Sequence, residues 1–236
     1  MLQPRAYPEL VGKALVLDTE PFIALTDDDE PWIEGMFLTI CVGFLVGVAR
    51  TIGYFLTTAT LPPTDSMLAA VLQSWRQYST TLPDEANVAL IESLLREAWA
   101  MGLFWNGYSG DWARLLTVIT TPTGLLLQWL LAGGIIYAAA RGLGGVGSFN
   151  QTLGATALMV APQALRFVEI IPFAAVSQLL LTVWALLILY RAVEVVHDLP
   201  WQRALLAALT PWLLLLVLAL LAGLLLGIGV LFWQLA

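Results

Sequence analysis

The chain carries a single histidine, His197, which follows Glu194 by three residues. Glu-x-x-His spacing places both side chains on one face of a helix, and di-iron helical bundles use it to hold metal. Such a centre needs two of these motifs, and the four apolar stretches after residue 114 hold no second histidine and no carboxylate. A lone imidazole could also ligate a haem or pigment axially, which the neighbouring charges disfavour. We therefore predict a structural or linker role for His197, and no metal or cofactor.

Three other groups of residues have types that could support chemistry. The acidic run Asp27-Asp28-Asp29-Glu30 lacks the spaced ligands and the glycine turn of a calcium loop, so we expect a solvated flank. The run Gly144-Gly145-x-Gly147 lacks the Gly-Lys-Ser/Thr ending of a phosphate-binding loop and is predicted to be a helix–helix turn. Cys41, the only cysteine, lies within an apolar run, remote from His197. No nucleophile–base set follows from this pattern, and no catalytic residue is predicted.

The composition indicates an integral membrane protein. Of 236 residues, 59% are hydrophobic and only 11% are charged, with a mean hydropathy of +0.83. Soluble domains carry roughly 25% charged residues. Long Leu/Ala/Val runs without alternation favour helices over a β-barrel. The net charge of −7 argues against nucleic acid as a partner.

The hydropathy pattern predicts an all-α polytopic membrane protein with five transmembrane helices. A polar, acidic segment covers residues 1–31, the first transmembrane helix covers 32–57, and a membrane domain of four helices covers 115–236. The four later spans are expected at about Leu115–Ala140, Ser148–Leu165, Phe173–Tyr190 and Ala204–Ala236. Arg50, near the end of the first span, is expected to extend its charge to the headgroups.

The segment 58–114 is predicted to form amphipathic helices that lie on the membrane surface or cap the bundle. Pro62-Pro63 ends the first span, and apolar residues then recur at helical spacing in two stretches. Glu92 and Arg96 stand at i,i+4 and are expected to pair. The tryptophans of this segment are interpreted as interfacial anchors, with an aromatic ligand cage as the alternative.

Two pairs of glycines four residues apart could form close helix contacts. Gly43 and Gly47 lie in the first span, and Gly223 and Gly227 in the last. We expect such faces to bind other integral membrane proteins or a second copy of the chain. Packing within the protein's own bundle remains an equal alternative.

A family pattern is carried by the glycine hinge, two prolines and the Glu-x-x-His pair. Its residues are Gly144, Gly145, Gly147, Phe149, Gln151, Thr152, Pro162, Pro172, Glu194 and His197. Together they resemble the Yip-domain family, five-pass membrane proteins named for their interaction with Ypt/Rab GTPases. The resemblance covers about residues 115–225. From the residues themselves, we expect the hinge glycines to be conformational, with Gly145 at positive φ and in close approach to another helix.

The resemblance implies a cytoplasmic N-terminus and a C-terminus outside, which basic residues alone do not decide because they divide three against three. It implies no enzyme activity. Two departures from the family pattern argue against binding of a Rab-type partner. Leu158-Met159-Val160 stands where bacterial relatives often carry a tyrosine, and the Asp-Leu-Tyr-Gly-Pro stretch of the eukaryotic members is missing. We therefore expect a prokaryotic relative in a cytoplasmic membrane. We predict a scaffold for other membrane proteins. The alternatives are an accessory subunit of a large bioenergetic complex and, third, a transporter or channel component.

Overall fold

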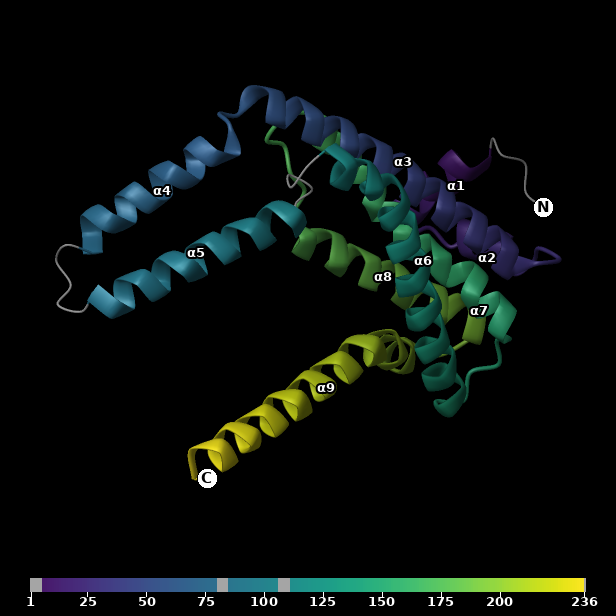
Figure 1. Ribbon diagram of the computed structural model, residues 1–236. Coiled ribbons are helices and arrows are strands. Elements are labelled where there is room, and N and C mark those ends of the chain that lie inside the picture. The colour runs from purple at the N-terminus through teal and green to yellow at the C-terminus, as the bar shows by residue number, and fades with distance from the viewer. Residues whose placement is uncertain (1–5, 80–84, 106–110, 236) are drawn as a thin grey trace. The chain divides into compact units, whose positions relative to one another are not determined.

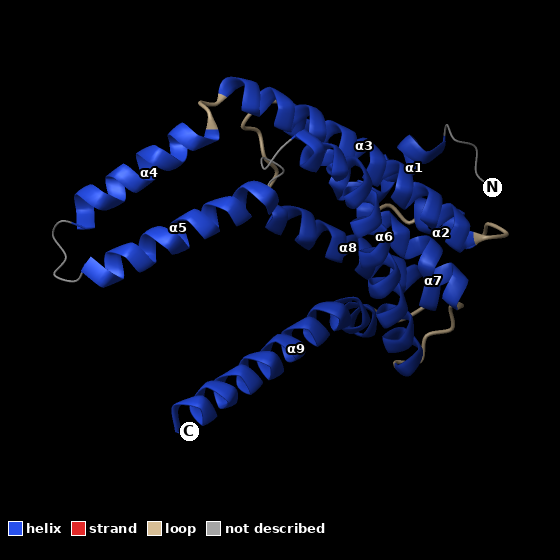
Figure 2. Cartoon of the chain, in the orientation of Figure 1, coloured by secondary structure: helices blue, strands red, loops and turns tan. Residues whose placement is uncertain are grey.

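The computed structural model describes residues 6–79, 85–105 and 111–235, and every regular element in them is helical (Figure 2). The elements follow one another as labelled in Figure 1. They are α1 (Tyr7–Leu15), α2 (Glu20–Thr26), α3 (Pro31–Thr60), α4 (Thr64–Ser79), α5 (Glu85–Trp105), α6 (Asp111–Gly142), α7 (Phe149–Thr156), the 3₁₀ helix η2 (Ala157–Ile170), α8 (Gln178–His197) and α9 (Trp201–Leu235).

Five helical stretches among the described residues are long and apolar enough to cross a membrane. They are Pro31–Thr60, Leu115–Gly142, Phe149–Ile170, Gln178–His197 and Trp201–Leu224. The prediction of an all-α membrane protein with five spans is confirmed.

Several of the span boundaries differ from the prediction, most of all in the fourth span, which ends at His197 instead of Tyr190. The fourth span begins at Gln178 instead of Phe173, because Phe173 has φ 65° and interrupts the helix after Pro172. Ser177 then starts α8, accepting a hydrogen bond at 3.4 Å from the Leu180 amide. The third span runs on to Ile170 as a 3₁₀ helix, and this extension brings Glu169 into the span.

The described residues form two compact units. Unit 1 contains those up to Val42, Thr123–Ala164 and those from Ser177 onward; unit 2 contains those of 43–122 and Leu165–Val176. The core of unit 1 is built around α7 and the start of η2, where every residue from Thr152 to Pro162 is buried. Trp129 of α6 is fully buried there, and its indole nitrogen donates to the Leu153 carbonyl at 2.9 Å.

The N-terminal segment, predicted as a polar flank, folds into two short helices that pack within unit 1. Phe22 and Leu25 of α2 are completely buried. The Trp184 indole of α8 donates a hydrogen bond of 2.9 Å to the carbonyl of Leu15. The Tyr7 hydroxyl donates to the buried Glu34 carboxylate, and burial together with this bond raises the pKa of Tyr7. Only one face of the segment is polar. The acidic composition of the whole segment therefore gave no sign of the apolar face that packs against the core.

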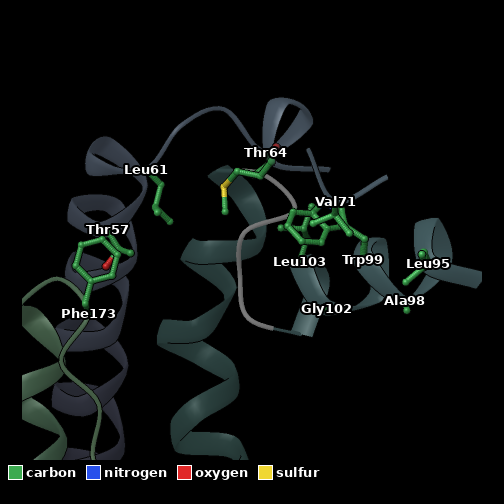
Figure 3. Close-up of a pocket in the computed structure, with 11 residues that line it drawn as sticks. Thr57, Leu61, Thr64, Val71, Leu95, Ala98, Trp99, Gly102, Leu103 and Phe173 are labelled. Carbon is green, nitrogen blue, oxygen red and sulfur yellow. The ribbon is translucent and has the colours of Figure 1, made fainter. Parts of the chain in front are cut away.

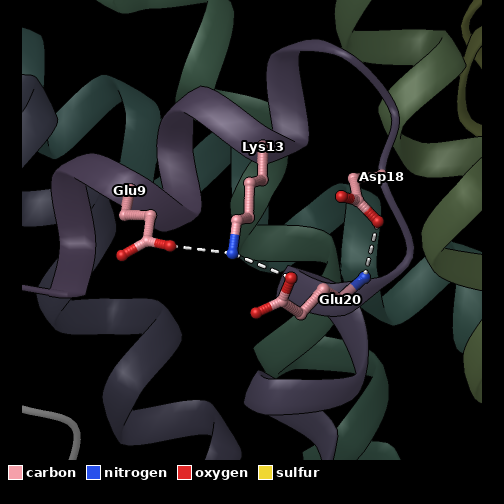
Figure 4. Close-up of polar contacts among 4 residues, drawn as sticks. All are labelled: Glu9, Lys13, Asp18 and Glu20. Atoms are coloured by element: carbon pink, nitrogen blue, oxygen red, sulfur yellow. Dashed lines mark hydrogen bonds and ion pairs between the residues drawn. The ribbon is translucent and has the colours of Figure 1, made fainter.

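A small charged network joins α1 to α2 (Figure 4). The Lys13 ammonium lies 2.8 Å from a carboxylate oxygen of Glu9 and 2.8 Å from one of Glu20. The Asp18 carboxylate accepts a hydrogen bond of 3.2 Å from the Glu20 amide. These bonds raise the pKa of Lys13 and lower that of Glu9. They fix the turn between the two helices, although exposed ion pairs contribute little to stability.

In unit 2, α4 and α5 form a helical hairpin (Figure 1). Arg76 of α4 holds the Glu92 carboxylate of α5 in a two-pronged bond of 2.7 and 3.0 Å. This bond lowers the pKa of Glu92. Arg96, the expected partner of Glu92, also lowers this pKa by its charge, but the hydrogen bonds of Glu92 go to the neighbouring helix. Sequence spacing identified the charged face but not the neighbour that it meets.

Candidate functional site

The glycine hinge between α6 and α7 is shaped by hydrogen bonds at both ends. Gly144 has φ 97°, a left-handed conformation that favours glycine, and the Gly145 amide donates to the Ala140 carbonyl at 2.9 Å to close α6. Ser148 caps α7: its hydroxyl accepts from the Gln151 amide at 3.2 Å, and the Gln151 side chain accepts from the Ser148 amide at 3.0 Å. These two reciprocal bonds form a capping box, and this gives the motif residue Gln151 a structural role at the start of α7.

Gly145 and Gly147 lie directly against the end of α8. A Cβ atom on Gly145 would stand 2.7 Å from His197 Nδ1, and one on Gly147 would stand 2.7 Å from the Val196 carbonyl oxygen. The Val146 amide also donates to the His197 carbonyl at 3.3 Å. The expectation of positive φ at Gly145 is corrected: Gly144 supplies the turn, and Gly145 supplies room for the imidazole.

His197 is the last residue of α8 and is 1% exposed, so it does not lie in an open linker. Its Nε2 is 3.0 Å from the Thr152 hydroxyl, whose own hydrogen is donated to the Ser148 carbonyl at 2.7 Å. A hydroxyl has one hydrogen to donate. Nε2 is therefore the donor of this bond, and the Thr152 oxygen accepts it.

Aromatic rings and arginines complete this hinge site. Tyr137 of α6 lies 6.3 Å from the His197 ring and meets Phe149 edge-on at 5.3 Å between centroids. Arg141 donates to the Gly145 carbonyl at 3.1 Å, and Arg203 of α9 donates to the Leu143 carbonyl at 3.2 Å. The hinge site thus ties α6, α7, α8 and α9 together within unit 1.

The Glu-x-x-His pair is divided between two networks. Glu194 pairs with Arg191 at i,i+3, whereas His197 bonds to Thr152. Among the described residues, no three His, Cys, Asp or Glu side chains gather where a metal ion could bind. What the described residues of the hinge site make with one another are packing contacts and hydrogen bonds. The two motif prolines lie elsewhere: Pro162 is buried in η2, and Pro172 lies in the turn before α8.

The two glycine pairs differ in their surroundings. A Cβ on Gly43 would stand 2.6 Å from Pro122 Cα, and one on Gly47 would stand 3.0 Å from the Thr117 carbonyl oxygen, so both face the backbone of α6 within unit 2. Gly223 meets nothing within 4 Å. Gly227 lies outside the residues whose side-chain surroundings are described. The geometry of the first pair favours internal packing.

Sequence reasoning missed a charged cluster in unit 2. Arg50 Nε lies 3.2 Å from the Glu169 carboxylate, and Arg166 Nη1 lies 3.8 Å from its other oxygen. Arg50 also donates to the Tyr54 hydroxyl at 2.7 Å. The charge of Arg50 is thus paired with Glu169 and bonded to Tyr54, and its extension to the headgroups stays a prediction. The i,i+3 spacing of Arg166 and Glu169 was the available signal, and it lay just beyond the predicted end of the third span.

The comparisons with known proteins give one match. A family model described as the Yip1 domain matches residues 14–223, a range that includes the first span, the hinge and His197. No curated protein and no solved structure matched the chain.

Proposed function

The chain belongs to the Yip1 domain family, and on that premise we propose that this five-span membrane protein acts by contact, as a scaffold that organises other integral membrane proteins. Close helix packing, not reactive groups, is what its described residues offer. We propose accordingly that it is not an enzyme.

The observation that supports a contact role is the exposure of α9. Every residue from Leu213 to Leu224 is exposed, so this part of the helix has no buried face. By contrast, α8 buries one side, including Leu181, Ile188 and Leu189. In a bilayer, small residues allow a second helix to approach, and Gly223 is open for such an approach. The α9 face around Gly223 is the contact surface that we propose.

A leucine pair in α9 tests this surface. Because a Cβ at Gly223 meets nothing within 4 Å, the Gly223→Leu part of the pair Gly223→Leu/Gly227→Leu should leave the thermal stability of the isolated protein unchanged. The same change blocks close helix approach, so proteins that co-purify with the wild type in mild detergent should be lost. Gly124→Leu, at another open and exposed position in α6, is the matched control and should retain them.

The same purification separates the alternatives. Partners that stay at fixed stoichiometry through size-exclusion would favour an accessory subunit of a large membrane complex, and a dimer of this chain alone would favour a homo-oligomer. Retention of all partners by the leucine variant would contradict the α9 surface. Turnover or ion flux by the pure protein would overturn the contact role and favour a transporter or channel.

We also propose that the protein resides in a prokaryotic cytoplasmic membrane with its N-terminus in the cytoplasm and its C-terminus outside. Five spans put the two ends on opposite sides. In a Cys41→Ala background, an impermeant thiol reagent added outside should label Ser74→Cys and Gln234→Cys but not Val16→Cys, where Val16 is 76% exposed. Equal labelling of positions 16 and 74 would mean that α3 does not cross the membrane.

A further inference from the structure

Unit 2 contains a cavity of about 520 Å³ where the end of α3 meets the α4–α5 hairpin (Figure 3). Every described residue that lines it belongs to unit 2. Two of these residues are threonines and the others are apolar, so no charged group faces the cavity from the described part of the chain. The volume is in the range of pockets that enclose small organic ligands. A charged ligand would be poorly accommodated, because burying a charge without a partner is costly.

The cavity is extended and follows the hairpin away from α3. Its lining residues on α4 fall between 64 and 71, and those on α5 fall between 95 and 103. At 1.5 Å per residue, each of these helical stretches is about 10–12 Å long. In Figure 3, Thr57 and Phe173 lie at one end of the lining and Ala98 lies at the other. An extended apolar cavity suits a hydrocarbon chain better than a compact molecule.

Thr57 gives the cavity a polar group that is short of a partner. Three other threonines of α3 donate their hydroxyl to the carbonyl four residues earlier, at 2.7–2.8 Å; they are Thr39, Thr51 and Thr58. Thr57 is only 8% exposed, yet among the described residues no hydrogen-bond partner is found for its hydroxyl. Buried hydroxyls are normally hydrogen-bonded. A ligand oxygen that accepts a bond from Thr57 would satisfy this group.

Phe173 marks the open end of the cavity. Its side chain lines the cavity and is nevertheless 69% exposed, so it stands where the cavity meets the surface. Its φ of 65° is a conformation that bulky side chains rarely adopt. Residues held in such conformations cluster at ligand sites and switch regions. The strained residue therefore lies at the same end of the cavity as the unsatisfied hydroxyl.

We propose that this cavity binds a neutral lipid. One hydrocarbon chain lies along the α4–α5 hairpin, and an uncharged oxygen at its end, such as an ester carbonyl, accepts a hydrogen bond from Thr57 beside Phe173. Lipid is the ligand that surrounds an integral membrane protein, and five helical stretches of this chain are apolar enough to cross a membrane. The site requires no partner protein and does not depend on the α9 surface.

Binding of 1-palmitoylglycerol to the full-length protein in detergent tests the proposal. Native mass spectrometry should show a single bound molecule, held several-fold more tightly than palmitate, which has the same chain but carries a charge. Ala98→Leu places a larger side chain at the apolar end and should weaken binding several-fold. Ala100→Leu is the matched control: it is the same change at another exposed position of α5, away from the cavity lining, and should leave binding unchanged.

A second pair of variants tests the polar end. Thr57→Val keeps the shape of the side chain but removes the hydroxyl, and it should weaken 1-palmitoylglycerol about five-fold, the effect of one neutral hydrogen bond. The melting temperature of the lipid-free protein should be kept or raised, because the lost hydroxyl had no partner. Thr58→Val, which removes the neighbouring hydroxyl outside the cavity lining, should not change the affinity.

Three outcomes would overturn the proposal. These are palmitate bound as tightly as 1-palmitoylglycerol, equal effects of Ala98→Leu and Ala100→Leu, and wild-type affinity in Thr57→Val. If Ala98→Leu proves unstable, a 1-acylglycerol with a diazirine in its chain can be photo-crosslinked to the wild-type protein. Peptide mapping should find the adducts within residues 64–71 or 95–103, and adducts confined to other segments would also overturn the proposal.

Discussion

Gly145→Ala should destabilise the protein by about 1–3 kcal/mol, the usual cost of forcing an extra carbon into a filled core. The added Cβ would stand 2.7–2.9 Å from three atoms of the His197 side chain, which is itself fixed by its bond to Thr152. Gly145→Val should be worse and reduce the folded, inserted fraction. Thermal melting in detergent and the yield of monodisperse protein measure both effects.

A compensating change identifies the cause. If contact with the imidazole is responsible, His197→Ala should cost stability alone but lose less in the Gly145→Ala background, so that the two changes are not additive. Gly142→Ala is the matched control, because nothing lies within 4 Å of its Cβ position. A Gly145→Ala protein that melts like the wild type but has lost affinity for a small molecule would show that the hinge site binds a ligand.

Gly43→Leu/Gly47→Leu should be the most damaging substitution pair, costing roughly 2–6 kcal/mol if the two overpacking terms add. Both glycines face backbone atoms of α6, at Pro122 and Thr117, and backbone cannot rotate away as a side-chain end can. We expect a lower melting temperature for the isolated protein, measured before any partner is added.

The comparison with α9 makes this result diagnostic. Gly43→Leu/Gly47→Leu should lose stability, whereas Gly223→Leu/Gly227→Leu should lose partners instead. Gly43→Ala alone should already lower the melting temperature by part of this amount, since its Cβ would lie 2.6 Å from Pro122 Cα. Unchanged melting of the Gly43→Leu/Gly47→Leu protein, with partners lost, would move the interface to the first span.

The five spans could be predicted because burial in lipid demands long apolar helices, and their number does not depend on tertiary contacts. The residues at which each span begins and ends were harder to predict from the sequence. Phe173, an apolar residue after a proline, has the sequence pattern of a helix start. Its φ of 65° is incompatible with a right-handed helix, so the helix begins later. Short helices were also missed: Pro8 and Pro21 in first turns, and Glu9 with Lys13 at i,i+4, were local signals for α1 and α2.

The hinge site shows where sequence reasoning reaches its limit. The motif glycines, Thr152 and His197 were all identified, but nothing local connects them, since Thr152 and His197 are 45 residues apart. Because Glu194 and Asp198 are charged, the sequence predicts that the histidine between them lies in an exposed linker. The structure shows that it is buried. Likewise, Arg50 and Glu169 meet only because Gly53 lets the two segments touch, with its Cβ position 1.8 Å from the Glu169 carbonyl oxygen.

The docking of α1 on α8 sets an order of events during biosynthesis. Leu15 and Trp184 are 169 residues apart, so this bond can form only after the fourth span has been made. At about 5–20 residues per second, the delay is roughly 10–30 s. Helix α1 thus reaches its final place only after α8 has been made.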